Sequence, residues 1–133
     1  MQLRTTVITP RGVFGFTCRV HRSDSPEKRL IEPAFYSNAP PKGVHHELEI
    51  VLVPQGTIHI HKHPESGRQF ICWSGKLKTV GQAEILFKMW CLLEAYSLCT
   101  GQDYAKLAIK FQLEPVIEFA AKHQIAIRSF WHE

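Results

Sequence analysis

The chain has 133 residues, of which 44% are hydrophobic and 21% charged, and its formal net charge is +4. This composition is ordinary for a globular protein, and the length is sufficient to bury a core in one domain, residues 1–133. No apolar run is long and uncharged enough to span a membrane, and the first residues lack the apolar core of a signal peptide. The four cysteines lie inside apolar runs, so we expect free thiols in a cytoplasmic protein that makes no membrane contact.

The positive charge is concentrated in the first third of the chain. Residues 1–45 contain seven Lys or Arg and three Asp or Glu, whereas residues 46–133 contain nine of each sign. A basic segment of this kind favours an acidic partner, nucleic acid included. The charge distribution therefore predicts that the binding residues lie in the N-terminal third.

Residues 12–20, GVFGFTCRV, alternate as a strand with both phenylalanines on one side. With Arg11 before it, this segment resembles the R/K-G-F-G-F-V signature of RNA-recognition and cold-shock domains, although Val13 interrupts the match. The resemblance implies a platform on which aromatic side chains stack on bases beside basic groups. The candidate binding residues are Arg11, Phe14, Phe16, Arg19 and Arg22. The alternative is that Phe14 and Phe16 are core residues, as phenylalanine usually is.

One further edge strand and two hairpins are predicted up to residue 80. Residues 30–36 form at best an edge strand, because Pro33 interrupts them. Residues 47–53 and 57–63 predict a hairpin around Pro54-Gln55-Gly56. In the register that keeps its apolar side chains on one face, Glu49 lies opposite His61. Residues 68–74 and 76–80 predict another hairpin.

The predicted hairpin places three histidines and two glutamates, Glu47 and Glu49, on its polar face. Imidazole and carboxylate groups are ligands for zinc, manganese or iron, so this face is a candidate site for a divalent metal. The candidate ligands are His59, His61, His63 and Glu49. The alternative, which we favour, is a solvated or partner-contacting face that needs no cofactor.

Two metal-binding families resemble this segment. His61, His63 and Glu65 are loosely similar to the cupin motif, in which two histidines on a strand are followed by a glutamate. Residues 59–61, His-Ile-His, match the signature with which rolling-circle replication initiators and single-tyrosine transposases hold a divalent ion. That resemblance implies attack of a tyrosine on a DNA phosphate that the metal polarises. The candidate tyrosines are Tyr96 and Tyr104.

From Thr79 the hydrophobic period becomes helical. Thr79 and Gln82 predict a capping box for a core helix that extends to about residue 98. Thr100 is predicted to cap a second helix to about residue 111, and a third is predicted for residues 115–123.

The last part of the chain contains a helix-turn-helix-like segment and one more predicted strand. Residues 104–123 resemble a helix-turn-helix, but apolar and acidic side chains stand where base-reading residues belong. We therefore predict a packed helical pair. Residues 125–131 predict a final strand.

Together these features predict an α+β fold with a mainly antiparallel sheet of about five strands and two to three C-terminal helices packed on one face. For function we predict a small basic non-enzymatic binding protein, of the kind a virus or mobile element encodes. It would contact nucleic acid or act as an inhibitor or adaptor of a nucleic-acid-handling machine. Two alternatives stay open. One is a metal-dependent phosphodiester-cleaving enzyme or transposase, and the other is a protein–protein adaptor without nucleic-acid contact.

Overall fold

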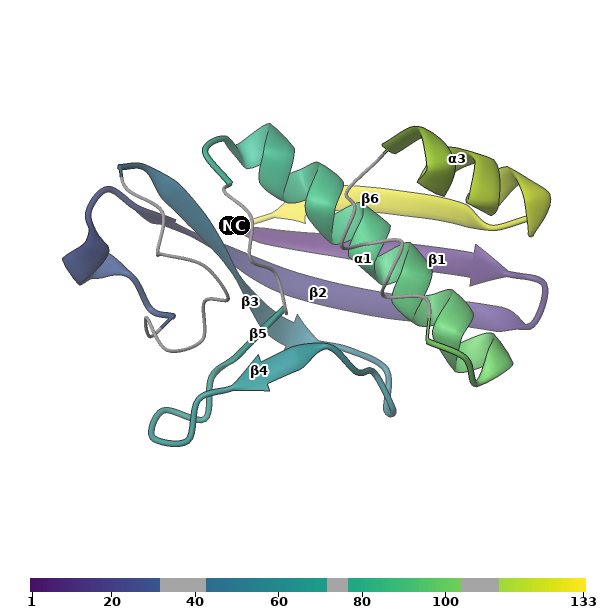
Figure 1. The fold of residues 1–133 in the computed structure, drawn as a ribbon, viewed down its shortest axis with the longest axis horizontal. Helices are drawn as coiled ribbons and strands as arrows, with labels where there is room; N and C mark the ends of the chain where they lie inside the picture. Colours follow the sequence, from purple (N-terminus) through teal and green to yellow (C-terminus); the bar gives the residue numbers. More distant parts are fainter. Residues whose placement is uncertain (32–42, 72–76, 104–112) are drawn as a thin grey trace.

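The structure is a computed structural model, and it describes residues 1–31, 43–71, 77–103 and 113–133. In these residues the regular structure consists of one antiparallel sheet, two α-helices and one short 3-10 turn (Figure 1). The predicted α+β class is therefore confirmed, with six strands rather than about five in the described residues. The strands are β1 (Gln2–Thr9), β2 (Gly12–Ser23), β3 (His45–Leu52), β4 (Ile60–Lys62), β5 (Gln69–Ile71) and β6 (Ala126–His132). The helices are α1 (Val80–Thr100) and α3 (Leu113–Lys122), with a short 3-10 turn, η1 (Pro26–Lys28). The strand order is β4-β5-β3-β2-β1-β6.

The two ends of the chain form neighbouring strands. β6 pairs with β1 over its whole length, from Gln2 opposite His132 to Ile8 opposite Ala126. Figure 1 shows the N- and C-termini side by side as a result. Sequence reasoning predicted β6 but did not single out β1, whose alternating Leu and Val residues are buried beneath α1. The basic N-terminal third therefore lies beside a strand from the other end of the chain.

The predicted hairpin between residues 47–53 and 57–63 is wrong. β5 lies between β3 and β4, with Phe70 opposite Glu49 on one side and opposite His61 on the other. The Pro54–Gly56 turn does form, but the chain then turns away, and His59 adopts a left-handed backbone conformation with φ 62°. Only three residues of β4 remain extended, and the position beside β3 is taken by β5. The true hairpin joins β4 to β5 through residues 63–68.

Three other predicted strands differ from the structure or lie partly outside the described residues. β5 covers part of the predicted strand 68–74, but residues 72–76 are outside the described residues. Val80, predicted as the end of a strand, is the first residue of α1. Of the predicted edge strand 30–36, Leu30 and Ile31 are not in a strand, and the remainder is outside the described residues.

Helix α1 has the predicted capping box. The Thr79 hydroxyl accepts the Gln82 N–H at 3.1 Å, and the Gln82 amide oxygen accepts the Thr79 N–H at 3.4 Å. The helix ends at Thr100, where Gly101 adopts the left-handed conformation that closes many helices. Thr100 therefore ends a helix and does not begin one. Most of the predicted second helix, with Tyr104, is outside the described residues, whereas α3 matches the predicted third helix.

Replacing Thr79 with alanine should lower the free energy of unfolding by about 1 kcal/mol, because the Gln82 N–H would lose its acceptor. Urea denaturation of Thr79→Ala measures the loss. A Thr79→Ser variant keeps a hydroxyl at the cap and serves as the control. Equal losses in both variants would show that the capping hydrogen bond is not the cause.

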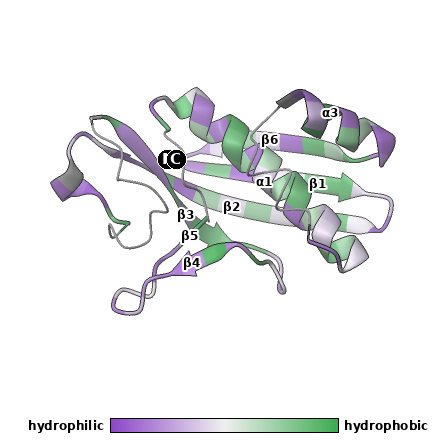
Figure 2. Cartoon of the chain, in the orientation of Figure 1, coloured by the Kyte–Doolittle hydropathy of each residue, from purple (hydrophilic) through white to green (hydrophobic). Residues whose placement is uncertain are grey.

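Helix α1 crosses one face of the sheet and forms most of the core (Figure 1). The Trp90 ring lies edge-on to Phe16 and stacks on Phe87, with ring centroids 5.8 Å and 5.9 Å away. Hydrophobic colour continues along α1 and the strands beneath it, and polar residues dominate around η1 (Figure 2). Cys18 and Cys91 are buried free thiols, as predicted, and burial raises the pKa of Cys18 to about 12. No helix among the described residues is long and apolar enough to cross a membrane.

Candidate nucleic-acid interface

The helices cover only one side of the sheet, and the opposite side is the candidate site (Figure 1). Successive strand residues point to opposite faces, so the neighbours of the buried residues Leu3, Thr5 and Val7 face away from α1. We call that side the helix-free face. Over β1, β2 and β6 it carries Gln2, Arg4, Thr6, Ile8, Val13, Gly15, Thr17, Arg19, His21, Ala126, Arg128, Phe130 and His132.

The two predicted stacking residues share a face, but it is the face that α1 covers. Phe16 is only 1% exposed and packs on Trp90, and Phe14 is partly buried against the same core. The structure thus shows the alternative, in which both phenylalanines are core residues. The alternation of residues 12–20 was correctly recognised, but alternation does not indicate which side of a strand is solvated.

The three predicted arginines do not lie together. The Arg11 guanidinium donates to the Cys99 carbonyl at 2.6 Å, in the turn between β1 and β2. Arg22 pairs with Asp24 at 3.2 Å and lies at the far end of β2, on the same side of the strand as the core residue Val20. Only Arg19 belongs to the helix-free face.

Residues that sequence reasoning did not select form the open part of this face. Arg4 on β1 is the direct cross-strand neighbour of Phe130 on β6, and Arg128 is one pleat further along β6. Phe130 is 54% exposed and Val13 on β2 is 66% exposed. None of the residues of β1, β2 and β6 is acidic, and neither Arg4 nor Arg128 has an ion pair within the described part of the chain. The alternation of Arg128 and Phe130 in β6 is the sequence pattern that could have indicated these binding residues.

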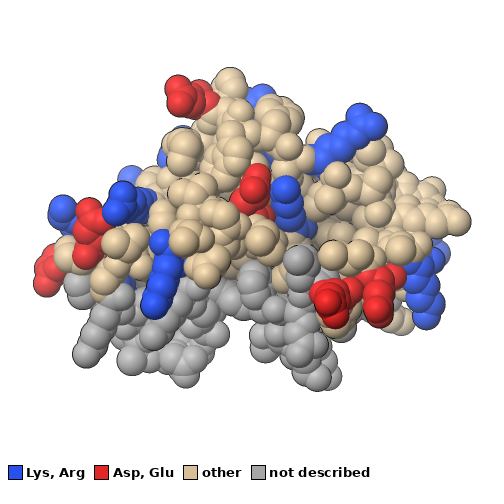
Figure 3. Space-filling view, turned by 90° about the horizontal axis from the view of Figure 1, so that it is seen from above, with Lys and Arg blue, Asp and Glu red and all other residues tan. Residues whose placement is uncertain are grey.

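Charge elsewhere on the molecule is mixed. In the view from above, Lys and Arg side chains are separated by acidic groups and by uncharged surface (Figure 3). The net charge of +4 therefore does not form one broad basic patch on the side shown there. The strands β1, β2 and β6 carry several cations and no carboxylate, and of the described strands only β3 contains acidic residues.

Two loops close the helix-free face over β3 and β5. Phe70 lies on this face, yet it is 1% exposed, because the turn after β4 folds over it and places the His63 ring 5.0 Å away. Glu47 is 2% exposed, and its carboxylate accepts the N–H groups of Leu30 and Ile31 at 3.0 and 2.7 Å. Burial raises the pKa of Glu47, and these hydrogen bonds oppose the rise.

A group of charged side chains lies where the open part meets the closed part. The His21 Nε2 atom is 2.7 Å from Glu49 Oε1, and the ring and carboxylate form a hydrogen bond. An Arg19 guanidinium nitrogen is 3.6 Å from Oε1, and the Arg68 Nε atom is 3.8 Å from Oε2. We call Arg19, His21 and Arg68, arranged around Glu49, the basic cluster. Its net charge is positive because two guanidiniums surround one carboxylate.

The four side chains proposed as metal ligands do not come together as one group. His59 contacts Asp103 through Nε2 at 2.8 Å, His61 lies beside Phe70, and His63 packs on the Phe70 ring. Glu49, the fourth candidate, belongs to the basic cluster instead. Among residues 1–31, 43–71, 77–103 and 113–133, no group of three or more His, Cys, Asp or Glu side chains has a geometry that could hold a metal ion. The predicted set depended on the pairing of β3 with β4, which does not form.

A buried carboxylate near His59 should make stability depend on pH. Glu94 of α1 accepts the Ile58 N–H at 3.3 Å, and burial raises its pKa from 4.5 to about 7. The folded state then binds a proton that the unfolded state has released, so the free energy of unfolding should fall as the pH rises from about 4.5 to about 7. Burial of His45 lowers its pKa to about 4 and acts in the opposite direction over an overlapping range.

The Glu94→Gln variant separates the two effects, because glutamine does not ionise and its amide oxygen can still accept the Ile58 N–H. The stability of the variant relative to the wild type should increase between about pH 5 and about pH 8. Denaturation in urea at both pH values measures this difference. Glu84→Gln, on the same helix and partly exposed, should show no such pH trend. A constant difference for Glu94→Gln would contradict the raised pKa.

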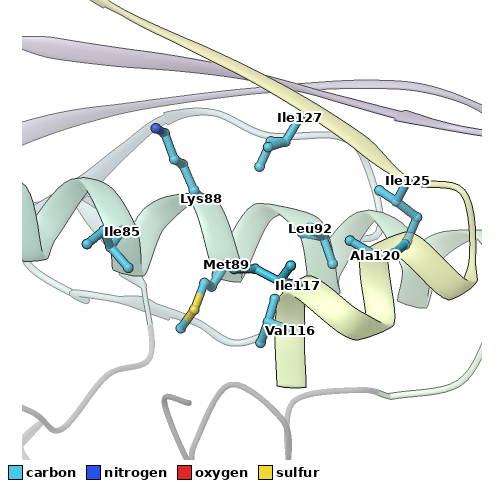
Figure 4. Close-up of a pocket in the computed structure, with 10 residues that line it drawn as sticks. Ile85, Lys88, Met89, Leu92, Val116, Ile117, Ala120, Ile125 and Ile127 are labelled. Carbon is cyan, nitrogen blue, oxygen red and sulfur yellow. The ribbon is translucent and has the colours of Figure 1, made fainter. Parts of the chain in front are cut away.

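An apolar groove lies on the other side of the sheet, between α1, α3 and the start of β6 (Figure 4). Its volume is about 490 Å³, and Ile85, Met89, Val116 and Ile127 are among its lining residues. Lys88 is the charged residue at its rim and pairs with Glu84 at 3.8 Å. The groove therefore offers hydrophobic contacts and little that would recognise a charged ligand.

Comparison with known proteins gives no match: no family model, no curated protein and no solved structure resembles the chain significantly.

Proposed function

We propose that the chain is a small binding protein that holds single-stranded nucleic acid on the open part of its helix-free face, over β6, β1 and β2. The observation that supports this most directly is the exposure of Arg4, Arg128 and Phe130 on the paired strands β1 and β6, which contain no acidic residue. Arginines bind phosphates, and an exposed aromatic ring provides a surface on which a base can stack. A sheet surface of this kind presents both kinds of group to an unpaired strand.

The partner class follows from the shape and charge of this surface. Sequence-specific reading of duplex DNA commonly uses a helix that enters the major groove, and neither of the two helices that the structure describes lies on the helix-free face. A single strand instead exposes bases and phosphates together, which matches the cross-strand neighbours Phe130 and Arg4. In this proposal the ligand contacts residues from both ends of the sequence, and the basic N-terminal third contributes Arg4 and Arg19.

Fluorescence anisotropy with labelled RNA and DNA oligonucleotides of about 12 nucleotides tests the proposal, because single-strand binding sites cover about 4–16 nucleotides. Binding should weaken as salt is raised. Three phosphate contacts give a slope of about −2 in a plot of log K against log salt concentration. A duplex of the same length should bind more weakly. No binding at low salt would contradict the proposal and would favour the protein–protein adaptor.

A further inference from the structure

The helix-free face is open on one side and closed on the other, and this limits the path of a bound strand. Over β6, β1 and β2 the surface is open apart from the buried Thr17, whereas over β3 and β5 two loops bury Glu47 and Phe70. A nucleic-acid strand lying across the open part meets these loops at β3. Its end, rather than its middle, therefore falls at the boundary.

The basic cluster lies at this boundary, and Glu49 does not occupy all of the N–H donors of its two arginines. The distances from Arg19 and Arg68 to Glu49, 3.6 and 3.8 Å, exceed the 2.7–2.9 Å that is typical of charge-assisted hydrogen bonds. The two arginine side chains are 46% and 45% exposed, so their N–H groups are accessible from solvent. His21 is held beside them by its hydrogen bond to Glu49.

The positions of these groups are fixed by the fold. Arg19 and His21 are on β2, and Glu49 is on β3 directly opposite Arg19. Arg68 ends the turn from His63, in which the His63 N–H donates to the Arg68 carbonyl at 2.9 Å. The guanidiniums thus approach one point from a strand and from a loop. Glu49 serves as their shared anchor.

We propose that the basic cluster binds the terminal phosphate of a nucleic-acid strand that lies on the helix-free face. A phosphate monoester carries a charge of about −1.5 to −2 at neutral pH, whereas an internal phosphodiester carries about −1. Its three terminal oxygens can accept from two guanidiniums at once, a geometry that arginine suits better than lysine does. The site rests on the proposed function, and it adds a preference for strands with a phosphorylated end.

Three oligonucleotides of one sequence test this site: one with hydroxyl groups at both ends, one with a 5′-phosphate and one with a 3′-phosphate. The wild-type protein should bind one of the phosphorylated strands roughly 10-fold more tightly than the strand without phosphate, as expected for added charge-assisted hydrogen bonds. The end that is preferred identifies the direction of the strand. Anisotropy titrations at one salt concentration provide the three Kd values.

The matched variants are Arg68→Gln in the basic cluster and Arg128→Gln at the far side of the same face. Arg68→Gln should abolish the preference and leave the strand without phosphate bound as before. Arg128→Gln should weaken the binding of all three strands by a similar factor. Thermal unfolding confirms that both variants fold.

If the wild-type protein binds all three strands equally, the terminal-phosphate site is refuted and the proposed function stands. If the protein binds none of the three strands, both the terminal-phosphate site and the proposed function are refuted. A preference that survives in Arg68→Gln and in Arg19→Gln would show that another group recognises the phosphate, which also overturns the assignment.

Discussion

Reversal of the charge at Arg128 should weaken the binding of a single-stranded oligonucleotide by roughly 10- to 100-fold, the loss expected when a charge-assisted contact is replaced by repulsion. Arg128 is exposed on β6 and has no ion pair within the described part of the chain, so Arg128→Glu should leave the thermal stability nearly unchanged. Anisotropy titration of Arg128→Glu against the wild type measures the effect. Arg4→Glu should act similarly, because Arg4 lies on the same face.

The control for this prediction is Lys122→Glu. Lys122 is exposed in the last turn of α3, away from the helix-free face, and its reversal changes the net charge by the same amount. We expect Lys122→Glu to change the affinity only slightly. The salt slope should fall by about 0.7 in Arg128→Glu, since one phosphate contact is lost, and should not change in Lys122→Glu. Equal weakening by both variants would show that binding follows overall charge and would refute the assigned face.

The local features of the fold were predictable from sequence because short-range chemistry determines them. Thr79 and Gln82 satisfy each other's backbone groups within one turn of chain, so the start of α1 can be recognised without knowledge of the rest. The same holds for the alternation in β2 and β6. These elements were assigned correctly to within a few residues.

Strand order was not predictable, because it depends on contacts between distant segments. The sequence around Pro54–Gly56 is typical of a hairpin, and that turn forms. The partner of β3 is nevertheless β5, whose buried Phe70 pairs opposite Glu49 and excludes β4 from that position. The proposed metal site depended on the expected pairing. Neither local pattern nor composition indicates that a strand later in the chain, β5, will insert between β3 and β4.

The two predicted stacking residues, Phe14 and Phe16, lie on the covered face for a related reason. An alternating strand has two faces, and which one is buried depends on where the helices pack. In β2 the phenylalanines face α1, so the solvated face carries Val13, Arg19 and His21 instead. The remaining contributors, Arg4 and Phe130, are 126 positions apart in sequence and become neighbours only through the pairing of β1 with β6. Charge counted along the sequence could not detect that combination.

Two phenylalanine variants test this reassignment, because Phe16 and Phe130 should have opposite effects. Phe16 is fully buried against Trp90, so Phe16→Ala should lower the free energy of unfolding by about 3–5 kcal/mol. Typical domains have only about 5–15 kcal/mol in total, so much of the protein would unfold under mild denaturant. Phe130 is mostly exposed, and Phe130→Ala should change the stability by less than about 0.5 kcal/mol.

The affinity for single-stranded nucleic acid should depend on Phe130 more than on Phe16, the reverse of the order for stability. Loss of a stacked base costs about 1–3 kcal/mol, so Phe130→Ala should raise the Kd for a single-stranded oligonucleotide by roughly 5- to 150-fold. Phe16→Leu, which retains a large apolar side chain and folds more readily than the alanine variant, should bind as the wild type does. Urea denaturation and anisotropy on the same preparations give both quantities. A binding defect in Phe16→Leu together with normal binding in Phe130→Ala would place the nucleic acid elsewhere and refute the helix-free face as its site.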